Sequence, residues 1–122
     1  EDSLDCSYKP WCDGMEGIFK EEAMHMAHGD QWAQKLAADP KTKAPLQEAF
    51  DRWYPRTMNI FGRANSAKNK IYRKWGLKKR DNDEVRQAFA KDIKEKADAF
   101  GLRVPDWKPE THKMSEEPFI PG

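Results

Sequence analysis

The chain has 122 residues, of which 35% are charged, 11% are aromatic and five are Trp. Its mean hydropathy of −1.03 is low for a globule that buries its own core, but the aromatic content excludes an intrinsically disordered composition. The net charge of +1 gives no bulk electrostatic preference for nucleic acid, and no apolar run reaches the length of a membrane span. We therefore expect one domain that completes its core against another chain or segment.

The periodicity of apolar residues predicts helices along the chain, beginning with a long helix over residues 11–38. Asp39 and Pro40 should end it, because the residue before a proline avoids the helical conformation. A second helix is expected to start near Pro45, since proline is favoured in a first helical turn. Pro55 lies inside that second pattern and should kink or divide it.

Two shorter helical stretches follow. Asn65-Ser66 should cap a short helix that is closed by Gly76. Asn82 should cap a last helix, and Gly101 has the position of the glycine that follows a helix end. No strand alternation or repeat is present, so the fold class is all-α.

The chain divides into a helical part, residues 1–102, and a Pro-rich extended tail, residues 103–122. The tail either packs on a neighbour through Trp107 and Phe119 or stays mobile. The two cysteines, Cys6 and Cys12, are expected to be reduced thiols in a cytoplasmic protein, because no signal peptide or Cys-x-x-Cys motif accompanies them.

The most informative pair is Glu22 and His25, three residues apart within an apolar stripe of the first helix. At about 100° per residue, Glu22 falls at the centre of the stripe and His25 on its flank. A carboxylate that faces a core is costly unless it is paired, protonated or bound to a metal. Glu-x-x-His projecting inward from a helix is the ligand unit of carboxylate-bridged di-iron bundles. The positions that define the stripe are Met15, Ile18, Phe19, Met26, Ala33 and Leu36.

A purely structural interpretation stands beside this one. A core Glu can pair with an Arg of another helix, and with 21 acidic residues and 3 His one such spacing can arise by chance. The position of the pair on the stripe strengthens the metal interpretation without removing the alternative.

Three further residues could form hydrogen bonds to a metal ligand and so orient it. His28 lies one turn beyond His25, at the edge of the stripe, where the alternative is an ordinary boundary histidine. Glu21 lies at the same edge, as a hydrogen-bond acceptor or a surface acid. Asp51 could orient a ligand His from another helix, or form a surface pair with the adjacent Arg52.

A dense basic cluster occupies thirteen positions in the second half of the chain. Its functional interpretation is contact with the phosphates of a nucleotide-bearing thioester or of nucleic acid, or with an acidic partner, chiefly through Lys78, Lys79 and Arg80. The alternative is a solvated helix face. No Gly-rich phosphate loop or Ser/His/Asp series is present, so a hydrolase has no support. The cluster is Lys68, Lys70, Arg73, Lys74, Lys78, Lys79 and Arg80.

An ordered series of motifs over residues 5–107 resembles the ring 1,2-phenylacetyl-CoA epoxidase catalytic subunit family, around its last metal-binding helix. The series is more specific than Glu-x-x-His alone. Its motifs are Cys6-Ser7-Tyr8, Pro10-Trp11, Lys20-Glu21-Glu22-x-x-His25, Gly29, Asp51-Arg52-Trp53, Phe61-Gly62, Asn65-Ser66-Ala67, Asn82-Asp83-Glu84-Val85-Arg86-Gln87-x-Phe89 and Gly101-Leu102-Arg103-Val104-Pro105-Asp106.

The resemblance implies a ferritin-like bundle with a non-haem di-iron centre that epoxidises an aromatic acyl-CoA with oxygen. The implied partners are a reductase and a ferritin-like structural subunit. By the family pattern Glu22 and His25 match the metal ligands of the fourth bundle helix, and no other catalytic residue is carried over. The donors suit iron, and manganese equally.

One departure from the family is large. A complete site needs a Glu from each of two helices and a second Glu-x-x-His, and no other acid-x-x-His occurs in this sequence. We therefore expect the C-terminal half of such a subunit, with the remaining ligands supplied by an N-terminal half or a separate chain. The alternatives are a helical interaction module and a non-catalytic ferritin-like scaffold subunit.

Overall fold

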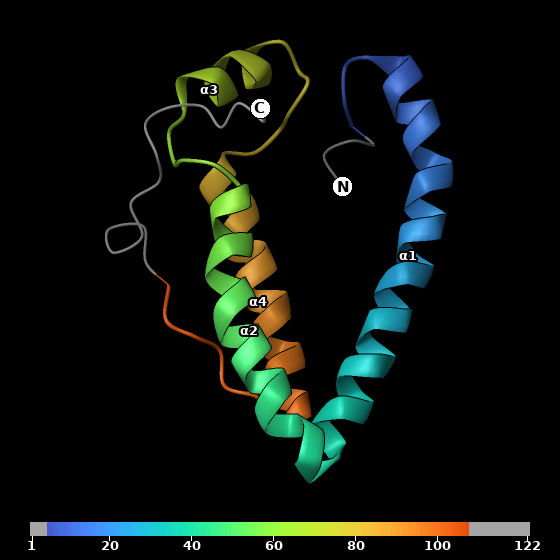
Figure 1. The fold of residues 1–122 in the computed structure, drawn as a ribbon. Helices are drawn as coiled ribbons and strands as arrows, with labels where there is room; N and C mark the ends of the chain where they lie inside the picture. The colour runs from blue at the N-terminus through green and yellow to red at the C-terminus, as the bar shows by residue number, and fades with distance from the viewer. Residues whose placement is uncertain (1–4, 108–122) are drawn as a thin grey trace, which may run out of the picture.

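The structure, a computed structural model, describes residues 5–107 as four helices, with no strand in that range (Figure 1). The all-α class expected from the sequence is confirmed. No helix within these residues is long and apolar enough to cross a membrane. Phe119 and the rest of the expected tail beyond Trp107 lie outside the described residues. The helices are α1 (Lys9–Ala38), α2 (Pro40–Ile60), α3 (Ala67–Lys74) and α4 (Asn82–Phe100).

A single residue, Asp39, separates α1 from α2. Its side chain accepts a hydrogen bond from the Lys41 N–H at 2.9 Å, and Pro40 has no N–H to satisfy at the first helical position. The expected start of the second helix near Pro45 is therefore wrong, because the Asp-Pro pair that ends one helix also begins the next. Pro55 does not divide α2, which continues through it.

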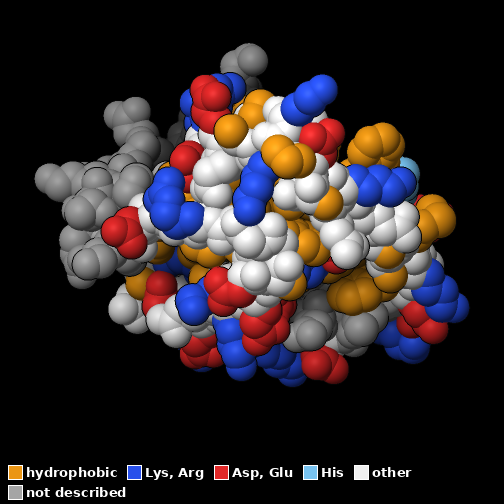
Figure 2. Space-filling model, turned by 90° about the horizontal axis from the view of Figure 1, so that it is seen from below, with side chains coloured by type: hydrophobic (Ala, Val, Ile, Leu, Met, Phe, Trp, Pro, Cys, Tyr) orange, Lys and Arg blue, Asp and Glu red, His pale blue; other side chains and the backbone are white. Residues whose placement is uncertain are grey.

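The short junction sends α1 away from the other helices, so that α1 and the α2–α4 pair diverge like the arms of a V (Figure 1). Contact between the arms lies toward their meeting point, where Asp30 forms an ion pair with Lys96 of α4 at 3.0 Å and Ala37 is buried. Seen from the end of the molecule where the two arms meet, hydrophobic side chains lie at the surface among charged ones (Figure 2). The large apolar side chains of α1 that stay exposed are Trp11, Ile18, Phe19, Met24, Met26 and Trp32.

Side chains of α2 and α4, which run side by side (Figure 1), pack on one another. Tyr54 and Met58 of α2 and Ala97 of α4 are buried. Phe61, just beyond α2, packs on Phe89 of α4 with ring centroids 5.2 Å apart. These side chains hold α2 and α4 together.

A buried arginine fastens the end of α2 to the start of α4. The Arg86 side chain is only 2% exposed; its Nε donates to the Met58 carbonyl at 3.1 Å, and Nη2 donates to the Gly62 carbonyl. Nη1 donates to Asp83 at 2.8 Å, and the guanidinium lies 4.8 Å from the centroid of the Trp107 ring. Each nitrogen of this buried guanidinium therefore has an acceptor, as burial of a charge requires.

The loops around α3 are held by side-chain caps. Ser66 caps α3, as expected, by accepting from the Asn69 N–H at 3.4 Å. Asp81, and not Asn82, caps α4, since its carboxylate accepts from a backbone N–H two residues on. Asn82 instead accepts from Asn69 Nδ2 and donates to the Arg63 carbonyl, both at 3.0 Å. Its longer-range bonds thus hold α3 against the start of α4.

After α4 the chain turns back along α2. Gly101 adopts the left-handed conformation expected of it, with φ of 71°. Arg103 and Gln47 then exchange two hydrogen bonds between side-chain amide and backbone, at 2.8 and 2.9 Å. Trp107 Nε1 donates to the Asn59 side chain at 3.2 Å. Trp107 therefore packs within its own chain.

Two glycines are expected to respond in opposite directions to replacement by Ala. Gly76 has φ of +74°, and an added Cβ would come 3.1 Å from the Ser7 Cβ, so Gly76→Ala should destabilise the fold by about 1–2 kcal/mol. Gly17 lies inside α1 with nothing within 4 Å, so Gly17→Ala should stabilise by about 0.5–1 kcal/mol. Urea unfolding measures both changes; a shift of the two midpoints in the same direction would contradict the reasoning.

Candidate metal centre

Glu22 and His25 lie one turn apart on α1 and contact each other. His25 Nδ1 is 3.2 Å from Glu22 Oε1, and the two side chains are 61% and 60% exposed, respectively. A carboxylate oxygen and an imidazole nitrogen are thus adjacent and open to a further ligand. The expectation that this pair faces a bundle interior stays a prediction, because the described residues leave both side chains exposed.

The α1 stripe is covered toward the C-terminal end of the helix and open along the rest. Ala37 is buried, and Ala33, on the same side of the helix, lines a cavity of about 170 Å³ with α2 and α4 residues. Nearer the N-terminus Ile18, Phe19 and Met26, which lie on the stripe on either side of Glu22, are exposed, and we call this part of the stripe the open sector. The candidate ligands therefore lie on the part of α1 that the α2–α4 pair does not cover.

His28 has a partner of its own on α1. Trp32 Nε1 donates a hydrogen bond to His28 Nε2 at 3.0 Å, and the two rings meet edge to face with centroids 6.4 Å apart. Metal binding through this nitrogen would displace the indole. Glu21 is exposed at the neighbouring edge of the helix. The supporting roles suggested for His28 and Glu21 remain predictions.

Asp51 lies on α2 and is occupied by residues of α2 and the returning chain. It accepts from Gln47 at 2.8 Å and forms an ion pair with Arg103 at 3.2 Å. Arg52, which is its neighbour in the sequence, pairs instead with Glu48 at 3.7 Å. In this structure Asp51 fixes the chain that follows α4, and a role in orienting a ligand His remains a prediction.

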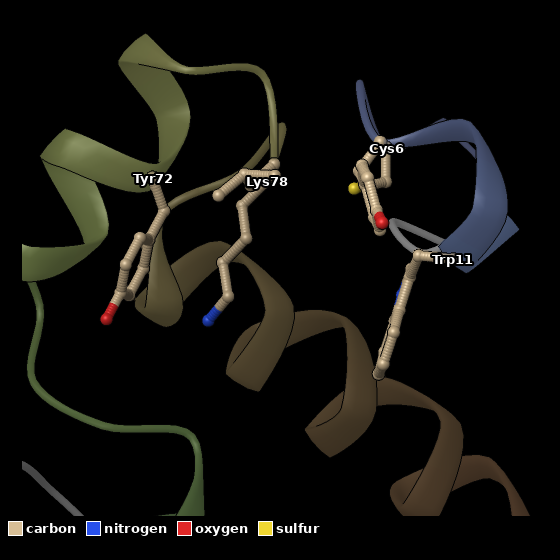
Figure 3. Close-up of a pocket in the computed structure, with 6 residues that line it drawn as sticks. Cys6, Trp11, Tyr72 and Lys78 are labelled. Atoms are coloured by element: carbon tan, nitrogen blue, oxygen red, sulfur yellow. The ribbon is translucent and has the colours of Figure 1, made fainter.

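The basic cluster adjoins a pocket of about 360 Å³ between the start of α1 and the end of α3 (Figure 3). Tyr72 and Lys78 form one wall, and Cys6 and Trp11 form the facing wall (Figure 3). The Lys78 ammonium lies 5.8 Å from the centroid of the Tyr72 ring. A cation beside aromatic and apolar walls suits a ligand that combines an anionic group with a flat or apolar one.

Of the other two cations expected to meet phosphate, one is open and one is partly enclosed. Lys79 is exposed. Arg80 is half-buried, and its carbonyl accepts from Asn69 Nδ2 at 3.5 Å. Lys78 and Lys79 are therefore the more accessible of the three.

Sequence reasoning did not anticipate this pocket, because its walls come from two segments about sixty positions apart. Ser7 closes it by donating through its hydroxyl to the Trp75 carbonyl at 2.7 Å and through its N–H to the Gly76 carbonyl at 2.9 Å. The Cys12 thiol donates to the Cys6 carbonyl at 3.0 Å. One sequence signal for the pocket was available, namely Tyr8-x-x-Trp11 beside a proline. This pattern indicates that a helix begins with aromatic side chains, but it does not indicate which segment packs against them.

Within residues 5–107, no three His, Cys, Asp or Glu side chains come together closely enough to hold a metal ion. Glu22 and His25 supply two donors, and the described part of the chain adds no third. A metal at this position would need donors from elsewhere.

Comparison with known proteins places the chain in a family. The family model described as phenylacetic acid catabolic protein matches residues 1–117. The chain is 34% identical over 117 residues to one subunit of the 1,2-phenylacetyl-CoA epoxidase of Escherichia coli (strain K12). This alignment covers 90% of the chain but 36% of that relative, so the chain spans about a third of the relative's length. The resemblance drawn from the motifs is thereby confirmed, and the chain belongs to the phenylacetic acid catabolic protein family.

Proposed function

We propose that this chain is part of a di-iron oxygenase subunit that epoxidises an aromatic acyl-CoA in an oxygen-dependent reaction. The observation that carries the proposal is the Glu22–His25 pair, with its oxygen and nitrogen 3.2 Å apart on an incompletely covered apolar stripe. Membership of the family and partial similarity to an epoxidase subunit support the choice of reaction.

The donor set fits one side of an iron site. A carboxylate and an imidazole are donors that iron accepts, and manganese also accepts them. Glu22 contributes negative charge and His25 a nitrogen donor, and Ile18, on the same face of α1 one turn before Glu22, is an apolar neighbour of the pair. When bound, the metal pair supplies the activation of oxygen.

The remaining ligands come from another segment in this proposal. Two Glu residues and a second Glu-x-x-His are needed, from the N-terminal half of the same subunit or from a separate chain. That segment would also cover the open sector of α1, where Trp11 and Ile18 are about half exposed. A reductase that delivers electrons and a ferritin-like structural subunit complete the proposed assembly.

Lys78, Lys79 and Arg80 would contact the phosphates of the acyl-CoA or an acidic surface of a partner subunit. Lys78 lines the aromatic pocket, and Lys79 stands in solvent beside it. Phosphates pair strongly with such cations when several converge.

Replacing these three cations with Ala in the assembled enzyme should weaken acyl-CoA binding or subunit association about tenfold at low salt, and much less at high salt. Binding titrations at two salt concentrations measure the effect. A control triple variant removes three exposed lysines elsewhere. Equal loss in both variants would show bulk charge alone, and no loss in either would leave the cluster as ordinary surface. The control positions are Lys20, Lys41 and Lys91.

Two alternatives keep the fold but not the chemistry. In a non-catalytic ferritin-like scaffold, or in a helical interaction module, Glu22 and His25 form only a surface ion pair, which contributes little to stability. Metal analysis of the assembled protein separates the proposals. About two irons per completed bundle are expected of the oxygenase, whereas both alternatives bind none.

A further inference from the structure

Cys6 and Cys12 lie next to each other where α1 begins. The Cys12 thiol donates a hydrogen bond to the Cys6 carbonyl at 3.0 Å, and both cysteines are free and half-buried. The bond lengths on either side of this contact place the two Cα atoms within about 8 Å of each other. A disulfide needs Cα atoms about 4.4–6.8 Å apart. The two thiols can therefore reach each other after at most a small movement of the chain.

The backbone around the two cysteines permits such a movement. Cys12 lies in the first turns of α1, where its N–H donates to the Tyr8 carbonyl at 3.4 Å. Cys6 lies in the non-helical residues 5–8 that precede the helix. Because the backbone hydrogen bonds of α1 begin at the Tyr8 carbonyl, two residues after Cys6, the chain can turn at Cys6 without unwinding the helix.

The Cys6 side chain is also part of the wall of the pocket that contains Lys78. The Cys6 sulfur points toward the facing wall, which Tyr72 and Lys78 form (Figure 3). A half-buried thiol in an open pocket of about 360 Å³ is accessible to a small solute such as a peroxide. The Cys12 thiol is held against the Cys6 backbone by its hydrogen bond, so a second thiol stands ready beside the first.

We infer that Cys6 and Cys12 are a redox-sensitive pair, which hydrogen peroxide converts to a reversible disulfide. Cys6 reacts first: its sulfur takes one peroxide oxygen and becomes a sulfenic acid, and the other oxygen leaves as water with the thiol proton. The Cys12 sulfur then attacks the Cys6 sulfur, so that the S–S bond forms and the sulfenic oxygen leaves as a second water. The two thiols thereby lose two electrons and two protons to H₂O₂. A small dithiol restores both cysteines and is itself oxidised to a disulfide.

Disulfide formation changes the wall of the pocket, because the Cys6 sulfur must turn toward the Cys12 thiol that lies against its backbone. The next residue, Ser7, holds the turn after α3 through its bonds to the Trp75 and Gly76 carbonyls. A turn of the chain at Cys6 therefore acts on this contact, and the junction of α1 with α3 loosens in the oxidised protein. The inference does not depend on the proposed oxygenase reaction.

Peptide mapping of the full chain after treatment with H₂O₂ and alkylation of the remaining thiols tests the pairing. Chymotrypsin cleaves after Tyr8 and Trp11, so the peptides that contain Cys6 and Cys12 stay together only through a disulfide. We expect joined peptides that separate after dithiothreitol is added. A mixture of ¹⁴N- and ¹⁵N-labelled chains shows whether each link lies within one copy. Links between copies, further oxidation without a link, or two unreacted thiols would each overturn the inference.

Two Ser variants test the order of reaction. In Cys12→Ser the sulfenic acid on Cys6 has no thiol to resolve it, so labelling by dimedone should rise about tenfold over the unsubstituted chain. Cys6→Ser is the matched control, in which Cys12 is the remaining thiol and should be labelled about tenfold less than Cys6 is in Cys12→Ser. Equal labelling in the two variants would contradict the role given to Cys6.

Hydrogen exchange at the Ser7 N–H tests the effect on the junction. This N–H donates to the Gly76 carbonyl at 2.9 Å, and its exchange should become several-fold faster in the oxidised protein and slow again after reduction. The Val85 N–H, which donates to the Asp81 carbonyl at the start of α4, is the reference and should not change. Unchanged exchange at Ser7 after complete disulfide formation would contradict the proposed loosening.

Discussion

Replacing Glu22 with Ala, or His25 with Ala, in the assembled protein is expected to remove bound iron and to lower acyl-CoA epoxidation by roughly 100-fold or more. Loss of groups that merely orient a ligand costs about 10- to 100-fold, and loss of a ligand should cost at least as much. Elemental analysis and epoxide formation measure the two effects together. The stability of α1 should change little, because both side chains are about 60% exposed.

Glu16→Ala is the control for this pair. Glu16 lies on the same helix and is exposed, but at about 100° per residue it points about 120° away from Glu22 and to the side opposite His25. We expect unchanged iron content and activity. Equal loss of iron in Glu16→Ala and Glu22→Ala would mean that the effect comes from disturbing α1, and the ligand assignment would be wrong.

The largest effect on stability is expected at Arg86. Arg86→Met leaves the Met58 and Gly62 carbonyls and the Asp83 carboxylate without their buried partner. Breaking a buried, hydrogen-bonded charge network of this kind costs about 3–5 kcal/mol. Urea unfolding of the full chain measures the loss. The indole of Trp107 should also become more accessible to a quencher, since the guanidinium over its ring is gone.

Arg52→Met provides the comparison. Arg52 lies on the α2 surface and pairs with Glu48 at 3.7 Å, an exposed contact that contributes little. We expect a change within about 0.5 kcal/mol. If the two Arg variants lose similar stability, Arg86 does not fasten the ends of α2 and α4.

The helices were largely predictable, because their caps and breakers act locally. Ser66 and Gly101 were assigned correctly from residue chemistry alone. The predicted start of α2 was wrong because Asp39-Pro40 fits both the end of one helix and the cap of the next. The continuity of α2 through Pro55 depends on neighbours such as buried Tyr54, which local propensity does not report.

Part of the candidate site could also be predicted from the sequence, and part could not. The adjacency of Glu22 and His25 follows from their three-residue spacing on one helix. The pocket between Trp11 and Tyr72 was not predictable, because it joins segments about sixty positions apart. Likewise, nothing in the sequence indicates that Arg86 reaches the carbonyls at the end of α2, since that depends on how α2 and α4 pack.

Diffraction from crystals of the assembled, iron-loaded protein, with data collected at the iron absorption edge, tests the central claim most directly. The account predicts an anomalous peak within about 2.0–2.2 Å of a Glu22 oxygen and a His25 nitrogen, on the open sector of α1. A peak coordinated by neither residue, with the Glu22–His25 pair intact in solvent, would contradict it.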